Sequence, residues 1–114
     1  MILLEFTPIQ VKIENDKMIC EHLSVAYELP LDEIESYEII TELPELIKMN
    51  GNGMDNVLSG TYEVYREGMY EVFLNPQNEL FIKFHIGDRK YIISGADAAA
   101  TQNLIELLET YINK

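Results

Sequence analysis

The stretch that decides the fold is LSGTYEVYREGMYEVFLNPQNELFIKFHIGDRKYIIS, residues 58–94. Apolar residues recur at every second position in successive runs, which cover residues 58–66, 70–74, 80–86 and 90–94. A period of two is typical of a half-buried β-strand. Polar residues, proline and glycine separate the runs, and Gly87-Asp88 suits a two-residue hairpin loop. The stretch therefore predicts short strands joined by hairpins.

The period changes after Gly95, where the sequence predicts a helix over residues 97–113. Either Ser94 or Asp97 can cap its start, because a side-chain oxygen accepts a hydrogen bond from an unpaired N–H of the first turn. Apolar residues at helical spacing form one stripe, which we expect to face the core: Leu104, Leu107, Leu108, Tyr111 and Ile112.

The first half of the chain reads as further strands over residues 9–14, 19–29 and 34–42. Asn15-Asp16-Lys17 supplies turn residues between the first two. In the second strand we expect the core face to carry Ile19, Leu23, Val25, Tyr27 and Leu29. Residues 43–57 read as a loop, because they contain Pro44 and the glycine-rich run Asn50-Gly51-Asn52-Gly53. Whether residues 2–6 add a strand is left open.

Seven short strands followed by one helix fit a single domain over residues 1–114. The predicted fold class is mainly β (α+β): a seven-stranded antiparallel barrel or sandwich, capped by one C-terminal α-helix. Strands joined by hairpins bury their apolar faces by closing into such a layered form.

The net charge of the chain disfavours some classes of binding partner. The chain carries 8 basic and 20 acidic residues, a formal net charge of −12. This balance disfavours nucleic acid and direct binding to anionic lipid, because both present phosphates that lysine and arginine would have to neutralise. The sequence has no signal peptide and no membrane-spanning stretch, so we expect a cytoplasmic protein with its one cysteine, Cys20, reduced.

The second half also resembles the bacterial pleckstrin-homology-like (PH-like) domains, many of unassigned function. The resemblance covers residues 9–113 and is most specific over 50–94. It lies in an Asn-Gly turn, a Gly-aromatic strand start, two hairpin strands and a Tyr-Ile-Ile-Ser strand before the terminal helix. It implies a PH-like fold and a binding role.

Eukaryotic relatives hold phosphoinositides with a basic cluster in the first hairpin, but here that hairpin, Ile13–Met18, has one lysine beside two acids. Phosphoinositide headgroup binding is therefore disfavoured.

Catalytic and metal chemistry find little support in the sequence. Cys20 and His22 share one face of a predicted strand, and His85 could join them in a metal site. However, zinc sites use three or four donors in recognisable pairs. No basic residue near Cys20 would activate its thiol as a nucleophile. Neighbouring acidic residues are expected on the solvated surface of so acidic a chain, so they do not indicate a pair of catalytic carboxylates. We expect no enzyme activity, no cofactor and no metal.

The candidate binding residues are Tyr65, Phe73 and Phe81. These aromatic side chains face outward, unless residues 43–57 or 2–6 fold over them, if the core face of the two strands is formed by Tyr70, Val72, Leu74, Leu80, Ile82 and Phe84. Exposed apolar patches often mark interfaces. The leading hypothesis is a non-catalytic module that binds a protein partner, or a second copy of itself, through this patch. The alternative is a small molecule or lipid tail bound in the barrel mouth under the terminal helix.

Overall fold

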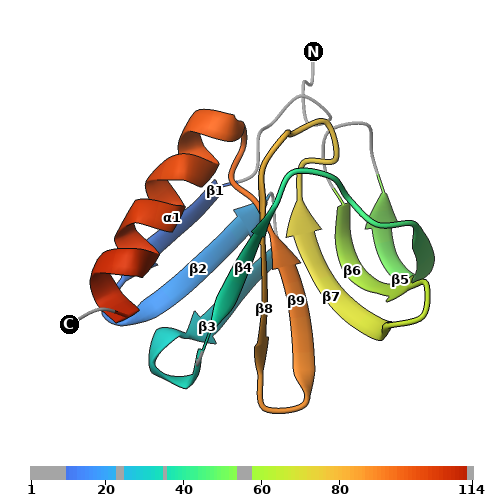
Figure 1. Ribbon diagram of the computed structural model, residues 1–114, viewed down its shortest axis with the longest axis horizontal. Helices are drawn as coiled ribbons and strands as arrows, with labels where there is room; N and C mark the ends of the chain where they lie inside the picture. The colour runs from blue at the N-terminus through green and yellow to red at the C-terminus, as the bar shows by residue number, and fades with distance from the viewer. Residues whose placement is uncertain (1–9, 23–24, 35, 54–57, 113–114) are drawn as a thin grey trace.

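The computed structural model of the chain describes residues 10–22, 25–34, 36–53 and 58–112. Within these ranges the chain forms nine strands, a 3-10 turn at Leu31–Glu33 and one α-helix (Figure 1). The strands are β1 (Gln10–Glu14), β2 (Lys17–His22), β3 (Val25–Pro30), β4 (Tyr37–Ile40), β5 (Leu46–Gly53), β6 (Leu58–Val64), β7 (Gly68–Leu74), β8 (Phe81–Ile86) and β9 (Arg89–Ile93). The helix is α1 (Ala98–Ile112).

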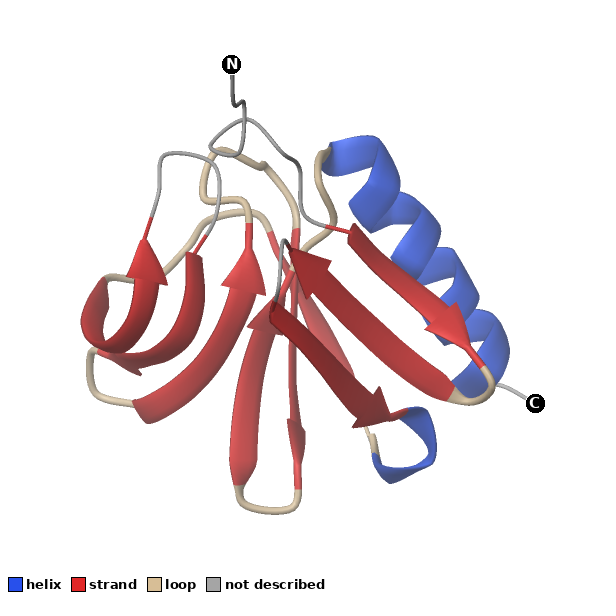
Figure 2. Ribbon diagram, turned by 180° about the vertical axis from the view of Figure 1, so that it is seen from behind, coloured by secondary structure: helices blue, strands red, loops and turns tan. Residues whose placement is uncertain are grey.

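The strands form two sheets, one of three strands in the order β1-β2-β3 and one of six in the order β4-β8-β9-β7-β6-β5. Figure 2 shows from behind that α1 lies beside the three-stranded sheet, at the opposite end of the molecule from β5 and β6. Two β-sheets and a single C-terminal helix confirm the predicted PH-like sandwich capped by a helix.

Two strands were not predicted. Residues 19–29 were expected to form one strand, but β2 and β3 are separate antiparallel strands in which Cys20 lies opposite Tyr27. Their continuous apolar alternation contains no glycine or proline that would mark a turn between them. The predicted loop 43–57 contains β5, which pairs with β6 through the glycine-rich run, so that Gly51 lies opposite Gly60.

The expected all-antiparallel order is also wrong at one place. β9 lies between β8 and β7, and it pairs in parallel with β7 over residues 71–73 and 91–93. The connection through residues 75–80 carries β8 beyond the position that β9 fills. Local hairpin signals do not specify such an insertion, because they report only on consecutive strands.

Two hairpin turns agree with the sequence. Asn15 and Asp16 have φ of 52° and 65° in the loop between β1 and β2. Gly87 has φ of 59° in the loop between β8 and β9. Positive φ at these positions is the geometry that asparagine, aspartate and glycine tolerate in tight hairpins.

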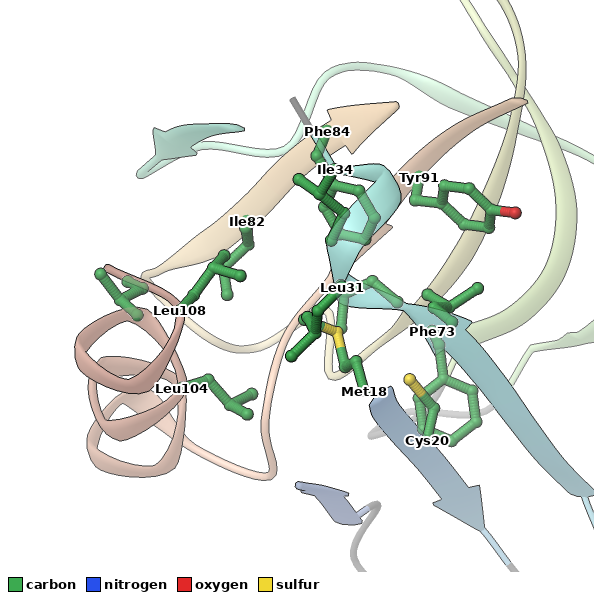
Figure 3. Packing of buried hydrophobic residues seen from close by; sticks show 13 residues of the cluster. Met18, Cys20, Leu31, Ile34, Phe73, Ile82, Phe84, Tyr91, Leu104 and Leu108 are labelled. Carbon is green, nitrogen blue, oxygen red and sulfur yellow. The ribbon is translucent and has the colours of Figure 1, made fainter. Parts of the chain in front are cut away.

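Both faces of the six-stranded sheet carry buried side chains. The first core lies between this sheet, the three-stranded sheet and α1 (Figure 3), and its buried members include Met18, Cys20, Leu29, Leu31, Ile34, Phe73, Ile82, Phe84, Tyr91, Ile93, Leu104, Ile105 and Leu108. The second core lies on the other face of the sheet, with Tyr62, Val64, Tyr70, Val72, Leu74, Phe81 and Ile92. In β2 the buried side chains are Met18 and Cys20 rather than Ile19, so the expected core face of this strand was the wrong one.

The helix begins at a capped position. Asp97 Oδ1 accepts a hydrogen bond of 2.8 Å from the backbone N–H of Ala100, which confirms Asp97 as the N-cap. The Ser94 hydroxyl instead accepts from the backbone N–H of Asn75, at 3.0 Å. The buried stripe consists of Thr101, Leu104, Ile105 and Leu108. Leu107, expected in the stripe, is 51% exposed.

Candidate functional site

The predicted aromatic patch does not exist as a surface. Tyr65 is 60% exposed, as expected, but Phe73 and Phe81 are each only 1% exposed. Phe73 belongs to the first core and Phe81 to the second. Leu43 and Leu46 pack against the second core, so part of the segment 43–57 does cover that face. The prediction that Phe73 and Phe81 face outward is therefore wrong.

The position of the Cys20 thiol disfavours a role as a nucleophile or metal ligand. Its side chain is fully buried in the first core, and burial raises its pKa to about 12. His85 is exposed on β8, where alternation puts it on the other face from Phe84, a first-core residue. The described residues contain no group of three or more histidine, cysteine, aspartate or glutamate side chains that could hold a metal ion.

A cavity, here called the larger cavity, opens between the two sheets. Its volume is about 510 Å³, and its walls come from β2 and β3 on one side and from β7, β8 and β9 on the other. Most of the lining is apolar and includes Cys20, Leu29, Phe73, Ile86, Tyr91 and Ile93. Cavities of about 300–1,000 Å³ with apolar walls and a few polar groups are the usual form of small-molecule sites.

Three charged side chains line this cavity, namely Glu28, Glu71 and Arg89. The carboxylate of Glu28 pairs with Lys17 Nζ at 3.2 Å. The carboxylate of Glu71 accepts a hydrogen bond of 3.0 Å from the Thr61 hydroxyl. Within the described ranges, no ion pair or hydrogen bond engages the Arg89 guanidinium. Arg89 is thus the charged group of the lining that is left for a ligand.

The smaller cavity has a volume of about 220 Å³ and lies beside the hairpin of β8 and β9. Most of its lining residues carry polar or charged groups: Ser36, Tyr37, Glu38, Tyr70, Lys83, Phe84, His85 and Lys90. Two of the eight basic residues of the chain therefore meet in one small hollow, although the net charge is −12. The Glu38 carboxylate of the lining and the carboxylate of Glu67, which pairs with Lys83, balance these two positive charges.

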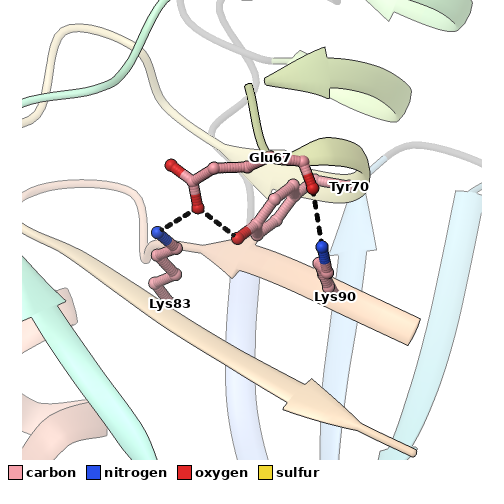
Figure 4. A network of polar contacts seen from close by, with 4 residues as sticks. All are labelled: Glu67, Tyr70, Lys83 and Lys90. Atoms are coloured by element: carbon pink, nitrogen blue, oxygen red, sulfur yellow. Dashed lines mark hydrogen bonds and ion pairs between the residues drawn. The ribbon is translucent and has the colours of Figure 1, made fainter. Parts of the chain in front are cut away.

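A polar network borders the smaller cavity (Figure 4). Lys83 Nζ and the Tyr70 hydroxyl both donate to Glu67 Oε1, at 2.7 and 2.8 Å. Lys90 Nζ donates to the backbone oxygen of Glu67 at 2.6 Å. Both ammonium groups lie 5.5 Å from the centroid of the Tyr70 ring. These bonds fix one carboxylate between a cation and a phenol.

The network shifts the titration of its members. The hydrogen bonds from Lys83 and Tyr70 hold the pKa of Glu67 below its ordinary value of 4.5. The hydrogen bond to Glu67 raises the pKa of Lys83 above 10.5. Burial, and then the bond to Glu67, raise the pKa of Tyr70. Glu67 and Lys83 are therefore an ion pair at neutral pH.

These lysines were not singled out in the sequence analysis, although one signal in the sequence brings them together. The two-residue loop Gly87-Asp88 fixes the register of the hairpin, so that His85 lies opposite Lys90. Alternation then places Lys83, His85 and Lys90 on the same face of the hairpin. No such signal identifies Glu67, because it lies in the loop of a different hairpin, between β6 and β7.

Comparison with known proteins gives one result. No curated protein and no solved structure matches the chain. Among the described residues, no helix has the length and hydropathy that crossing a bilayer requires. A family model described as Bacterial PH domain matches residues 9–108. Since this match covers most of the chain and agrees with the observed sandwich and terminal helix, the chain belongs to the bacterial PH domain family.

Proposed function

We propose that this bacterial PH domain is a non-catalytic binding module and that its site is the larger cavity between the two sheets. PH-like domains are in general binding modules. The observation that carries the proposal is a hollow of about 510 Å³ with mostly apolar walls. The cavity lies between the sheets and not under α1, where the sequence had suggested a barrel mouth.

The charges of the lining support one class of ligand. Glu28 and Glu71 already have hydrogen-bonding or ionic partners, whereas Arg89 has none among the described residues. A guanidinium at an apolar cavity pairs well with a carboxylate. We propose as ligand a small molecule with an apolar body and one acidic group, such as a medium-chain fatty acid.

A comparison of decanoate with decanol, which has a similar apolar chain but no acidic group, tests this proposal. Decanoate is titrated into the purified protein, and binding is followed by the amide NMR signals of β3, β7 and β9. Saturable binding of decanoate is expected. Arg89→Gln should weaken decanoate several-fold and leave decanol unchanged, because only decanoate carries the acidic group.

A bulky substitution provides the blocking control. Leu29→Trp places a large ring in the cavity wall and should abolish binding, whereas Leu107→Trp on the exposed side of α1 should not. The chain has no native tryptophan, so the fluorescence of each variant also reports whether the new ring is buried. Absence of saturable binding to the wild type, or equal binding by both variants, would refute the proposal.

A second candidate function is self-association through exposed apolar side chains. Ile47, Glu63 and Met69 lie opposite one another across β5, β6 and β7, and Tyr65 lies in the adjoining loop. Ile47 and Met69 are 47% and 51% exposed. Light scattering over a dilution series gives the mass directly. An oligomer that Tyr65→Ser plus Met69→Ser converts to a monomer of 13.2 kDa would support this function, and a wild-type monomer at every concentration would reject it.

A further inference from the structure

We propose that the smaller cavity is a binding site for an anionic group, a carboxylate or a phosphate, and that Glu67 is its built-in competitor. The site differs from the larger cavity in its place and in its lining. The proposal therefore stands or falls separately from the proposed function.

The site already demonstrates carboxylate recognition. Glu67 Oε1 receives a charge-assisted hydrogen bond of 2.7 Å from Lys83 and a second bond of 2.8 Å from the Tyr70 hydroxyl. The two donors come from β8 and β7, the strands on either side of β9, and they converge on one oxygen, which is an arrangement that can bind an external anion. An oxygen of a ligand placed where Glu67 Oε1 lies would inherit both bonds.

The local charge favours an anion once Glu67 has moved away. Lys83 and Lys90 contribute two positive charges to the lining, and Glu38 contributes one negative charge. Each ammonium group lies 5.5 Å from the centroid of the Tyr70 ring, so the negative face of the ring attracts both cations. Glu67 neutralises this excess in the present arrangement.

Glu67 can leave more easily than its partners can. It belongs to the loop of residues 65–67 between β6 and β7, whereas Lys83 lies within β8 and Tyr70 within β7. Its side chain is 40% exposed, against 22% for Lys83. Exposed ion pairs contribute little net stability, because water replaces the lost contact. A competing anion therefore displaces Glu67 at small cost, while the donors on the sheet keep their places.

The first experiment removes the competitor. Wild type and Glu67→Gln are titrated with inorganic phosphate and, separately, with acetate, and binding is followed by the amide NMR signals of β8 and β9. Glu67→Gln should bind phosphate about tenfold more tightly than wild type does. A preference for phosphate over acetate would indicate a phosphate group as the natural ligand, and the reverse preference would indicate an acidic side chain or chain end.

Matched lysine variants separate a defined site from general charge. In the Glu67→Gln background, Lys83→Met should abolish phosphate binding. Lys17→Met, which removes a lysine with an ion pair elsewhere, should leave phosphate binding unchanged. Thermal unfolding confirms that each variant is folded, and Glu67→Ala replaces Glu67→Gln if the latter is not. Equal phosphate affinity in wild type and in the folded Glu67 variant, or equal loss with both lysine variants, would overturn the proposal.

Discussion

Phe73 and Phe81 lie on opposite faces of the same six-stranded sheet, each fully buried in a different core. Phe73 packs with Met18 and Cys20 of the three-stranded sheet in the first core (Figure 3). Phe81 packs with the second core, to which Leu43 and Leu46 add their side chains. Because both faces of the sheet are covered at Phe73 and Phe81, neither side chain is available to a partner.

Truncating either phenylalanine should therefore destabilise the fold. We expect Phe73→Ala and Phe81→Ala each to lower the free energy of unfolding by about 3–5 kcal/mol, because each leaves a cavity in a packed core. Urea denaturation followed by circular dichroism measures the change. Tyr65→Ala, at an exposed position, is the control and should change stability by less than about 0.5 kcal/mol. A loss below about 1 kcal/mol for both phenylalanine variants would contradict their burial.

The contrast between these residues shows what periodicity can establish. Alternation over residues 58–94 located β6 to β9 and their turns, because each strand repeats with a period of two. It could not tell whether one face of a strand or both faces are buried, since this depends on which distant segments cover them. The position of β9 between β8 and β7 likewise depends on pairing between segments that are distant in the sequence, which no local pattern encodes.

The helix gives a second example. Leu107 was expected in the buried stripe and is exposed, whereas Thr101 and Ile105 are buried. The Thr101 hydroxyl accepts from the backbone N–H of Gly95 at 2.9 Å and donates to the Asp97 carbonyl at 2.8 Å. These bonds let a polar residue face the core and set the rotation of α1. A count of apolar residues alone misses such a position.

Thr101 should therefore matter more for stability than its polarity suggests. Thr101→Val keeps the shape of the side chain but leaves the N–H of Gly95 without its acceptor, and it also removes one acceptor of Asn78 Nδ2. The expected loss is about 1–3 kcal/mol in the free energy of unfolding. The matched control is Thr110→Val in the same helix, where an exposed hydroxyl donates to the Glu106 carbonyl. Equal effects of the two substitutions would contradict this role of Thr101.

The burial of Cys20 predicts an inert thiol. Ellman's reagent should label the native protein very slowly at neutral pH and label the urea-unfolded protein at once, because only the thiolate reacts and burial raises the thiol pKa to about 12. Above the ordinary value of 9.0 the unfolded chain loses this proton while the folded chain keeps it. This group therefore makes stability fall as the pH rises through that range. Cys20→Ala should remove that part of the alkaline loss, and rapid native labelling would show that the thiol is accessible.

The ion pair of Glu67 and Lys83 predicts the opposite dependence in acid. The pKa of Glu67 is lowered in the folded state, so the unfolded chain takes up its proton first as the pH falls below 4.5. The stabilisation by this carboxylate is complete above that pH and is lost as the pH falls through the folded pKa. Thermal unfolding of wild type and Glu67→Gln over an acid pH series should therefore converge at low pH and diverge towards neutral pH. Tyr70→Phe, which removes one of the two donors to Glu67 Oε1, should lie between them. Parallel curves for wild type and Glu67→Gln would show that Glu67 has the same pKa in the folded and unfolded chains.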